Sequence, residues 1–261
     1  MAAGLKPCTT FGVDDDQGAG VAFDFASAWE ALADEFGDSE LFVCGDVRRT
    51  WTVGVDRAAR IAGLLRGAGL GHADNVGLCL YNGNEYLEAQ WGAMKERCDP
   101  FNVNYRYSAP ELRSLLDDAD ARAVFYSAPL REHFDEIRGD LPDLTLLVEV
   151  GGDGDTPDWA VDYEAAIASV EPADRIERSP DDLWLLFTGG TTGRPKGVMW
   201  PHVAMVGTMA NIYRGMKMPL PESVDEVVAR AREIRERGMV TRQLAAAPLM
   251  HGTAGITALS T

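Results

Sequence analysis

The feature that most constrains this chain is a buried strand that leads directly into a glycine-rich loop. Residues 183–187 are five apolar residues in a row, and the following residues 188–197 read TGGTTGRPKG. Glycines carry no Cβ atom, so the backbone N–H groups of such a loop stay open to a ligand. Threonine hydroxyls and the ammonium group of Lys196 add further donors. This combination predicts a cradle for a polyanion, and phosphate fits it best.

The loop is not the phosphate loop of nucleoside triphosphatases, whose pattern is G-x-x-x-x-G-K-[ST]. Lys196 follows Pro195, where that pattern requires glycine, and it precedes Gly197, where the pattern requires a magnesium-binding hydroxyl. The sequence therefore excludes that class of nucleotide site.

Short apolar strands alternate with helical segments along most of the chain. We expect helices over 24–36, 56–66, 85–95, 109–116, 202–214 and 223–237, and strands over 76–80, 100–103, 124–126, 144–150 and 183–187. Residues 41–44 and 49–53 predict a hairpin, and Ser27 with Glu30 predicts a capping box in the first helix. The alternation indicates an α/β fold with a parallel sheet covered by helices.

Composition and charge exclude several classes of function. The net charge is −17, which argues against a protein that binds nucleic acid or an anionic membrane. Cys8, Cys44, Cys79 and Cys98 have no ligand-like spacing, so we interpret them as reduced thiols. We see no apolar run of the roughly 20 residues that a membrane span needs and no leader pattern, so we expect a cytoplasmic protein.

The loop resembles the phosphate-binding loop of adenylate-forming (AMP-binding) enzymes, whose signature is approximately T-S-G-T-T-G-x-P-K-G. The chain departs from it only at Gly189, which removes one hydroxyl. Residues 54–94 and 103–125 are similar to the N-terminal part of acyl-CoA synthetases, and APLMHGTAG (247–255) is similar to the family's P-L-x-H-x-x-G segment. The resemblance covers roughly residues 25–261 and implies the family's large N-terminal domain, an α/β structure of layered sheets flanked by helices.

The resemblance also implies a domain organisation. Residues 1–20 are expected to be a flexible tail, and residues 21–261 an adenylating domain that is truncated at its C-terminal side. The mobile C-terminal domain of the family, which carries its catalytic lysine, is expected to be absent. We therefore expect this chain to be an N-terminal half that does not complete thioester formation alone.

The resemblance assigns roles to individual residues. The phosphates of Mg-ATP would be bound by Thr188, Gly189, Gly190, Thr191, Thr192, Gly193 and Lys196. His251 would lie near the carboxylate under attack, as the catalytic-site residue; His202 receives no catalytic role, and no protein-held metal site is expected. The implied reaction activates a carboxylic acid with ATP, Mg²⁺ and coenzyme A.

Two questions stay open at the level of sequence. Met205, Met209 and Met216 share one helical face with Ile212, which indicates either a wall of an acyl tunnel for a fatty or bulky apolar acid or ordinary core packing. The acceptor is coenzyme A by resemblance. The alternatives are an adenylating domain that loads a carrier protein and a non-catalytic module that binds nucleotide or a partner. The sequence is also compatible with a homo-oligomer.

Overall fold

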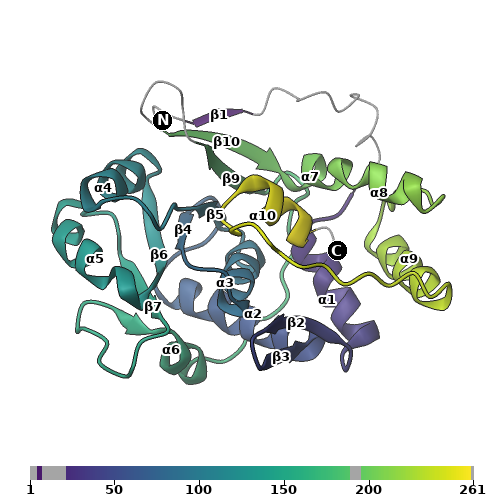
Figure 1. Cartoon of the computed structure of the whole chain (residues 1–261), viewed down its shortest axis with the longest axis horizontal. Helices are drawn as coiled ribbons and strands as arrows, with labels where there is room; N and C mark the ends of the chain where they lie inside the picture. The colour runs from purple at the N-terminus through teal and green to yellow at the C-terminus, as the bar shows by residue number, and fades with distance from the viewer. Residues whose placement is uncertain (1–4, 8–21, 189–194, 260–261) are drawn as a thin grey trace.

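The computed structural model of the chain describes residues 5–7, 22–188 and 195–259 (Figure 1). Its helices are α1 (Phe25–Phe36), α2 (Trp51–Gly67), α3 (Asn84–Lys95), α4 (Ala109–Asp118), α5 (Arg131–Ile137), α6 (Tyr163–Ser169), α7 (His202–Thr208), α8 (Ala210–Gly215), α9 (Val224–Glu236) and α10 (Gly252–Leu259). Its strands are β1 (Leu5–Pro7), β2 (Glu40–Cys44), β3 (Val47–Thr50), β4 (Asn75–Cys79), β5 (Asp99–Asn102), β6 (Ala121–Ser127), β7 (Leu146–Val150), β8 (Val161–Asp162), β9 (Leu183–Thr188) and β10 (Lys196–Pro201). Short 3₁₀ turns, η1 (Ala128–Leu130) and η2 (Arg138–Asp140), flank α5.

The centre of the fold is an eight-stranded sheet in the order β1-β10-β9-β5-β4-β6-β7-β8. Its neighbouring strands are parallel except β9 and β10, which are antiparallel. The α/β class is therefore confirmed, but the sheet is mixed rather than wholly parallel. The reason is local, since the chain reverses after the glycine-rich loop and adds β10 beside β9. Within the expected tail, Leu5–Pro7 forms β1 beside β10, and the rest of residues 1–20 lies outside the described residues.

Helices cover both faces of the sheet (Figure 1). Successive side chains of a strand point to opposite faces, and β6 shows this directly. Ala123 and Phe125 pack in one apolar cluster with α2, α3, α6 and α10, whereas Val124 and Tyr126 pack in a second cluster with α4 and α5. Because all four side chains are fully buried, β6 lies between two helical layers at the middle of the core.

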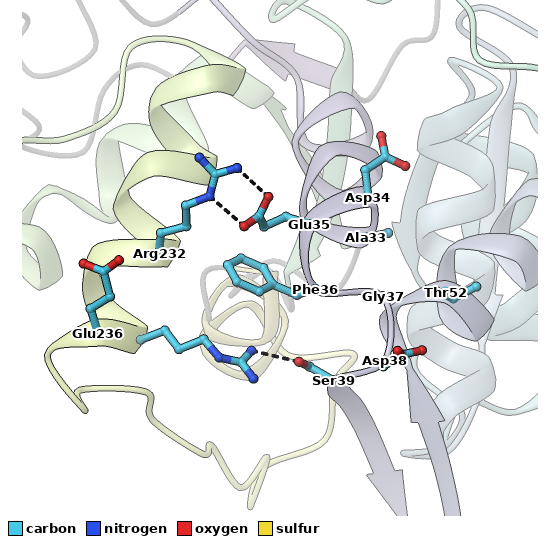
Figure 2. A pocket seen from close by; sticks show the side chains of 11 residues that line it. Ala33, Asp34, Glu35, Phe36, Gly37, Asp38, Ser39, Thr52, Arg232 and Glu236 are labelled. Carbon is cyan, nitrogen blue, oxygen red and sulfur yellow. Dashed lines mark hydrogen bonds and ion pairs between the residues drawn. The ribbon is translucent and has the colours of Figure 1, made fainter.

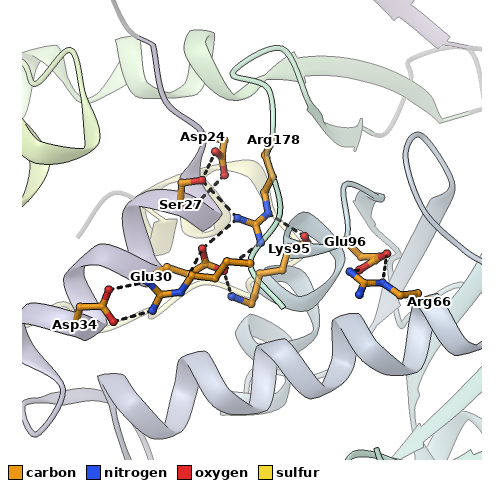
Figure 3. A network of polar contacts seen from close by, with 9 residues as sticks. Asp24, Ser27, Glu30, Asp34, Arg66, Lys95, Glu96 and Arg178 are labelled. Atoms are coloured by element: carbon orange, nitrogen blue, oxygen red, sulfur yellow. Dashed lines mark hydrogen bonds and ion pairs between the residues drawn. The ribbon is translucent and has the colours of Figure 1, made fainter. Parts of the chain in front are cut away.

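Helix α1 begins with a cap that differs from the predicted one. Asp24 is the N-cap, and its carboxylate accepts hydrogen bonds from the backbone N–H of Ser27 at 2.9 Å and from the Ser27 hydroxyl at 2.6 Å. The predicted capping box of Ser27 and Glu30 is wrong, because Ser27 is already inside the helix. Glu30 is buried instead and forms ion pairs with Lys95 and Arg178 (Figure 3).

The predicted hairpin is present, but its second strand is shorter than expected. β3 ends at Thr50, and the Thr50 hydroxyl accepts a hydrogen bond from the backbone N–H of Val53 at 3.4 Å. Helix α2 therefore begins at Trp51, five residues before the predicted start. The stabilisation of the helix start by the Thr50 cap outweighs the strand propensity of the residues that follow it.

Two residues of the methionine face after β10, Met205 and Met209, pack in the core. The predicted single helix over 202–214 is divided into α7 and α8 at Met209. Met205 is 1% exposed and packs with α1 and Trp184, Met209 packs against the same cluster, and Ile212 is 39% exposed. Of the two interpretations of this face, these positions favour ordinary core packing over a tunnel wall.

Candidate functional site

The two ends of the glycine-rich loop (residues 188–197) lie side by side. Thr188 ends β9, Lys196 begins β10, and the two residues are directly opposite each other in the antiparallel register. Directly opposite residues of such a pair project from the same face of the sheet. Both residues are exposed, so a hydroxyl and an ammonium group are available together to a ligand at the sheet edge.

The remaining predicted phosphate ligands lie outside the described residues. These are Gly189, Gly190, Thr191, Thr192 and Gly193. The structure therefore brings together Thr188 and Lys196, and the contribution of the five residues between them stays a prediction.

The position of the loop follows from the burial of β9. Trp184, Leu185, Leu186 and Phe187 are all buried, because β9 lies inside the sheet and is covered on both faces. Burial ends at Thr188, where the chain leaves the sheet. β9 runs parallel to β5, and β5 runs parallel to β4, so the carboxyl ends of all three strands lie at one edge of the sheet. Ligands of open α/β sheets bind at this carboxyl edge.

His251 reaches the same edge from a distant part of the sequence. It is exposed, and it directly precedes helix α10. Asn82, which follows β4, fixes the preceding backbone: its Oδ1 accepts from the N–H of Leu249 at 2.7 Å, and its Nδ2 donates to the Ala247 carbonyl at 3.1 Å. Helix α10 then packs close to β9, since a Cβ atom on Gly252 would lie 2.7 Å from Leu186 Cδ2.

Asn102 connects the two predicted parts of the site, and sequence reasoning did not single it out. This side chain ends β5 and is 7% exposed. Its Nδ2 donates to the carbonyl of Phe187 at 3.0 Å and to that of Met250 at 2.8 Å, and its Oδ1 accepts from the N–H of Phe187 at 2.8 Å. The available signal was a polar residue between the apolar residues Phe101 and Val103, which alone does not name its partners.

His202 lies away from this edge and has a structural environment. It begins α7, is 1% exposed, and its Nδ1 accepts from the backbone N–H of Phe25 at 3.5 Å. Burial lowers the pKa of the imidazole to about 4, against smaller opposite effects of Asp24 and Asp182. A neutral, enclosed imidazole agrees with the absence of a predicted catalytic role.

A second group of perturbed side chains occupies the opposite, amino edge of the sheet. Burial, together with the carboxylates of Asp182 and Asp74, raises the pKa of Asp99 to about 7. Asp182 pairs with Arg97 through two hydrogen bonds of 2.9 and 2.7 Å. Asp99 begins β5 and Asp182 directly precedes β9, so this group joins strand starts and lies away from the loop.

A cavity of about 800 Å³ lies between the end of α1 and helix α9 (Figure 2). Arg232 pairs with Glu35 beside it, and the Arg235 guanidinium donates to the Ser39 hydroxyl and lies over the Phe36 ring. Its lining includes no residue of β9, β10 or α10. The ion pair of Arg232 with Glu35 joins the two helices beside the cavity, and we assign the cavity no part in the site.

Within residues 5–7, 22–188 and 195–259, no group of three or more His, Cys, Asp or Glu side chains is placed to hold a metal ion. The same part of the chain contains no helix that is long and apolar enough to cross a membrane. At this edge Thr188 offers a hydroxyl, Lys196 an ammonium group and His251 an imidazole, all on exposed residues. This arrangement suits an anionic ligand.

Comparison with known proteins decides the family. The sequence model of the family described as AMP-binding enzyme matches residues 29–259. The chain belongs to this AMP-binding enzyme family. The resemblance inferred from the loop is thereby confirmed, and the matched range includes β9, β10 and the His251 segment.

Individual AMP-binding relatives carry names of acyl-CoA ligases. The medium-chain acyl-CoA ligase Mig of Mycobacterium avium is 38% identical over 249 residues, which are 89% of this chain and 44% of that protein. A medium/long-chain-fatty-acid–CoA/3-oxocholest-4-en-26-oate–CoA ligase of Mycobacterium tuberculosis strain H37Rv is 39% identical over 189 residues, which are 70% of this chain and 34% of that protein. The chain thus spans less than half the length of these curated relatives.

Solved structures of AMP-binding enzymes share the fold. A fatty acyl-CoA synthetase of Mycobacterium tuberculosis superposes with a TM-score of 0.68 at 22% identity, over 95% of this chain and 43% of that one. The N-terminal domain of FACL13 from the same organism gives a TM-score of 0.67 at 24% identity, over 91% and 54%. These neighbours confirm the expected architecture, a central sheet flanked by helices as in the N-terminal domains of adenylate-forming enzymes.

Proposed function

We propose that this chain forms the nucleotide-binding part of an ATP-dependent acyl-CoA ligase that acts on a fatty or other bulky apolar carboxylic acid. The observation that carries the proposal is the β9–β10 register, which places Thr188 opposite Lys196 at the two ends of the glycine-rich loop. The names of the relatives support the acid class, since they are medium-chain and medium/long-chain acyl-CoA ligases. The domain limits, residues 21–261, and a cytoplasmic location belong to the same proposal.

The proposed reaction has two steps. A carboxylate oxygen attacks the α-phosphorus of ATP, and the bond to the β-phosphate oxygen breaks as pyrophosphate leaves. The thiol sulfur of coenzyme A then attacks the acyl carbon, a thioester forms, and AMP leaves with the bonding electrons while the thiol proton passes to solvent. Such transfers depend on positioning and charge neutralisation more than on a protein nucleophile.

The proposed roles follow from what each residue can donate. The ammonium group of Lys196, the hydroxyls of Thr188, Thr191 and Thr192 and the backbone N–H groups of Gly189, Gly190 and Gly193 would bind the β- and γ-phosphates. His251 is exposed at the same edge and would orient the acid beside the α-phosphate. Mg²⁺ would enter with the ATP phosphates and neutralise their charge, as this ion commonly does in phosphoryl-transfer sites.

The test is carboxylate-dependent exchange between ATP and labelled pyrophosphate, with this chain beside a version extended through the rest of its reading frame. The acids are acetate, octanoate, palmitate, benzoate and a sterol carboxylate. We expect the extended version to exchange with medium, long or polycyclic acids and to form a thioester when coenzyme A is added. An optimum at acetate would contradict the acid class. Transfer of the acyl group to a carrier protein instead of coenzyme A would contradict the proposed acceptor. If no acid supports exchange, the alternative of a non-catalytic binding module is favoured instead.

A further inference from the structure

The carboxyl edge of the sheet contains one buried side chain whose hydrogen-bonding groups all point to the candidate site. The amide of Asn102 has two N–H donors and one carbonyl acceptor, and all three are used. Two of the bonds pair with the backbone of Phe187, and the third pairs with the carbonyl of Met250. Phe187 directly precedes Thr188, and Met250 directly precedes His251.

The bonds to Phe187 replace sheet hydrogen bonds at the end of β5. The ladder between β5 and β9 pairs Phe101 with Leu185, and the Asn102 side chain then continues the contact to Phe187 through both its donor and its acceptor. A side chain that bonds to both the N–H and the C=O of one residue restrains the two peptide units on either side of that residue. The start of the glycine-rich loop is therefore fixed by β5 and not only by the neighbouring strand β10.

The third bond extends this control to Met250, which is 63 residues after Phe187 in sequence. No sheet pairing joins β9 to the segment before α10 among the described residues. Asn82 bonds to that segment at Leu249 and Ala247, but neither of these two hydrogen bonds reaches β9. Asn102 is thus the side chain whose hydrogen bonds reach both segments.

We propose that Asn102 is a positioning residue that sets the placement of Thr188, where the glycine-rich loop begins, relative to His251. The inference rests on the proposed function, in which the loop binds the phosphates and His251 orients the acid. In-line attack requires the acid oxygen and the α-phosphorus to be held together, and a displacement of about 1 Å lowers such rates up to roughly 100-fold. Because the Asn102 amide holds both Phe187 and Met250, it restricts the motion of the two segments relative to each other.

Amide hydrogen exchange tests the coupling without any need for activity. The variant Asn102→Asp keeps the acceptor and removes both donors, and Asn102→Ser is the second variant should Asn102→Asp not fold. We expect exchange about tenfold faster or more in the peptides that cover 183–188 and 247–252. The variant Asn82→Ala should accelerate exchange only in the second peptide. Unchanged exchange in either peptide of the Asn102 variants would overturn the proposal.

A matched control lies at the other edge of the same sheet. Asn75 begins β4, is 9% exposed, and its Nδ2 donates to the carbonyl of Ala119 at 2.6 Å. The variant Asn75→Asp also removes a buried amide donor from the sheet, so it reproduces a general loss of stability. We expect it to leave exchange at 183–188 and 247–252 within about twofold of the wild type.

Kinetics of the extended version then separate positioning from folding. At a temperature where all variants stay folded, we expect Asn102→Asp to lower kcat of pyrophosphate exchange about 10- to 100-fold, whereas Asn75→Asp stays within about twofold. Equal losses in the two variants would show a structural role only and would overturn the proposal. Wild-type inactivity with every acid would instead contradict the proposed function, and the exchange experiment would still decide whether Asn102 couples the two segments.

Discussion

At the residue scale, Lys95 and Glu30 form an ion pair in which each side chain is 5% exposed (Figure 3). Burial lowers the pKa of Lys95, and the Glu30 carboxylate opposes that change. Arg178 adds two hydrogen bonds of 3.1 Å to Glu30. The pair joins α1 to α3, so its charges are compensated only while these helices stay together.

We expect Lys95→Met to reduce the free energy of unfolding by about 3 kcal/mol, because it leaves the Glu30 carboxylate buried with one cation fewer. The matched variant is Asp34→Asn, which removes an exposed pair with Arg175 whose side chains are 60% and 54% exposed; it should cost less than about 1 kcal/mol. Urea unfolding of both variants checks this. Equal losses would contradict the assigned burial of the pair.

His202 should make stability depend on pH. Its folded pKa of about 4 lies below the value of about 6.5 for an exposed imidazole. Between these values the unfolded chain binds a proton that the folded chain does not. The contribution is therefore fully present above pH 6.5 and is lost as the pH falls toward 4, by at most about 1.4 kcal/mol per pH unit.

The difference between the wild type and His202→Gln isolates this effect from other titrating groups. We expect the stability of the wild type, measured relative to the variant by urea unfolding, to decrease as the pH is lowered from 7 to 4.5. A difference that does not change with pH would mean that His202 is not buried in its neutral form.

At the scale of elements, α2 and α3 cross closely at a glycine. A Cβ atom on Gly92 would lie 2.4 and 2.5 Å from Cγ2 and Cβ of Ile61 and 3.0 Å from the carbonyl oxygen of Ala58. Such a methyl group does not fit without separation of the helices, since Cβ of Ile61 cannot rotate away from its own backbone.

We expect Gly92→Ala to destabilise the protein by about 1–3 kcal/mol through overpacking. Gly67 ends α2 with open space around its Cα, so Gly67→Ala should be neutral or stabilise by up to about 1 kcal/mol. Thermal unfolding of the two variants gives the comparison. A Gly92→Ala variant as stable as the wild type would contradict the close crossing.

The sequence predicted elements well where apolar periodicity was long. The ranges of α1, α3, α4, β4, β6 and β9 match the predicted segments to within a few residues at each end. It missed α5, α6, α10 and β10, because a short element such as β10, with the sequence KGVMWP, has no clear period and is defined by its pairing with β9. The cap at Asp24 was missed because either Asp24 or Ser27 could have been the N-cap of α1. The burial of Glu30 decided between them, since a buried Glu30 cannot serve as the partner of Ser27 in a capping box.

Part of the candidate site could be predicted because its chemistry is local. The glycine-rich loop and Lys196 are consecutive in sequence, so their composition alone indicated a phosphate cradle. Asn102 could not be found in the same way, since its partners Phe187 and Met250 are 85 and 148 residues away. Only the strand order brings β5 between β4 and β9 and so defines this contact.

At the scale of the whole molecule, the net charge of −17 contrasts with the donors around the loop. An acidic protein repels a nucleotide at long range, so binding has to come from a few local groups. Lys196 is the exposed ammonium group that the described part of β9 and β10 offers at this edge. Phosphate binding at this edge therefore depends strongly on one side chain.

The most direct test of the central claim compares the Kd for ATP of Lys196→Gln with that of Lys217→Gln, by titration calorimetry. Lys217 follows α8 and is also exposed, so both variants remove one exposed positive charge. Loss of a charged phosphate contact of about 1.5–3 kcal/mol predicts a Kd raised about 10- to 150-fold for Lys196→Gln. Lys217→Gln should bind ATP within about twofold of the wild type. Equal Kd values for the two variants would contradict the claim that the glycine-rich loop binds the phosphates of ATP.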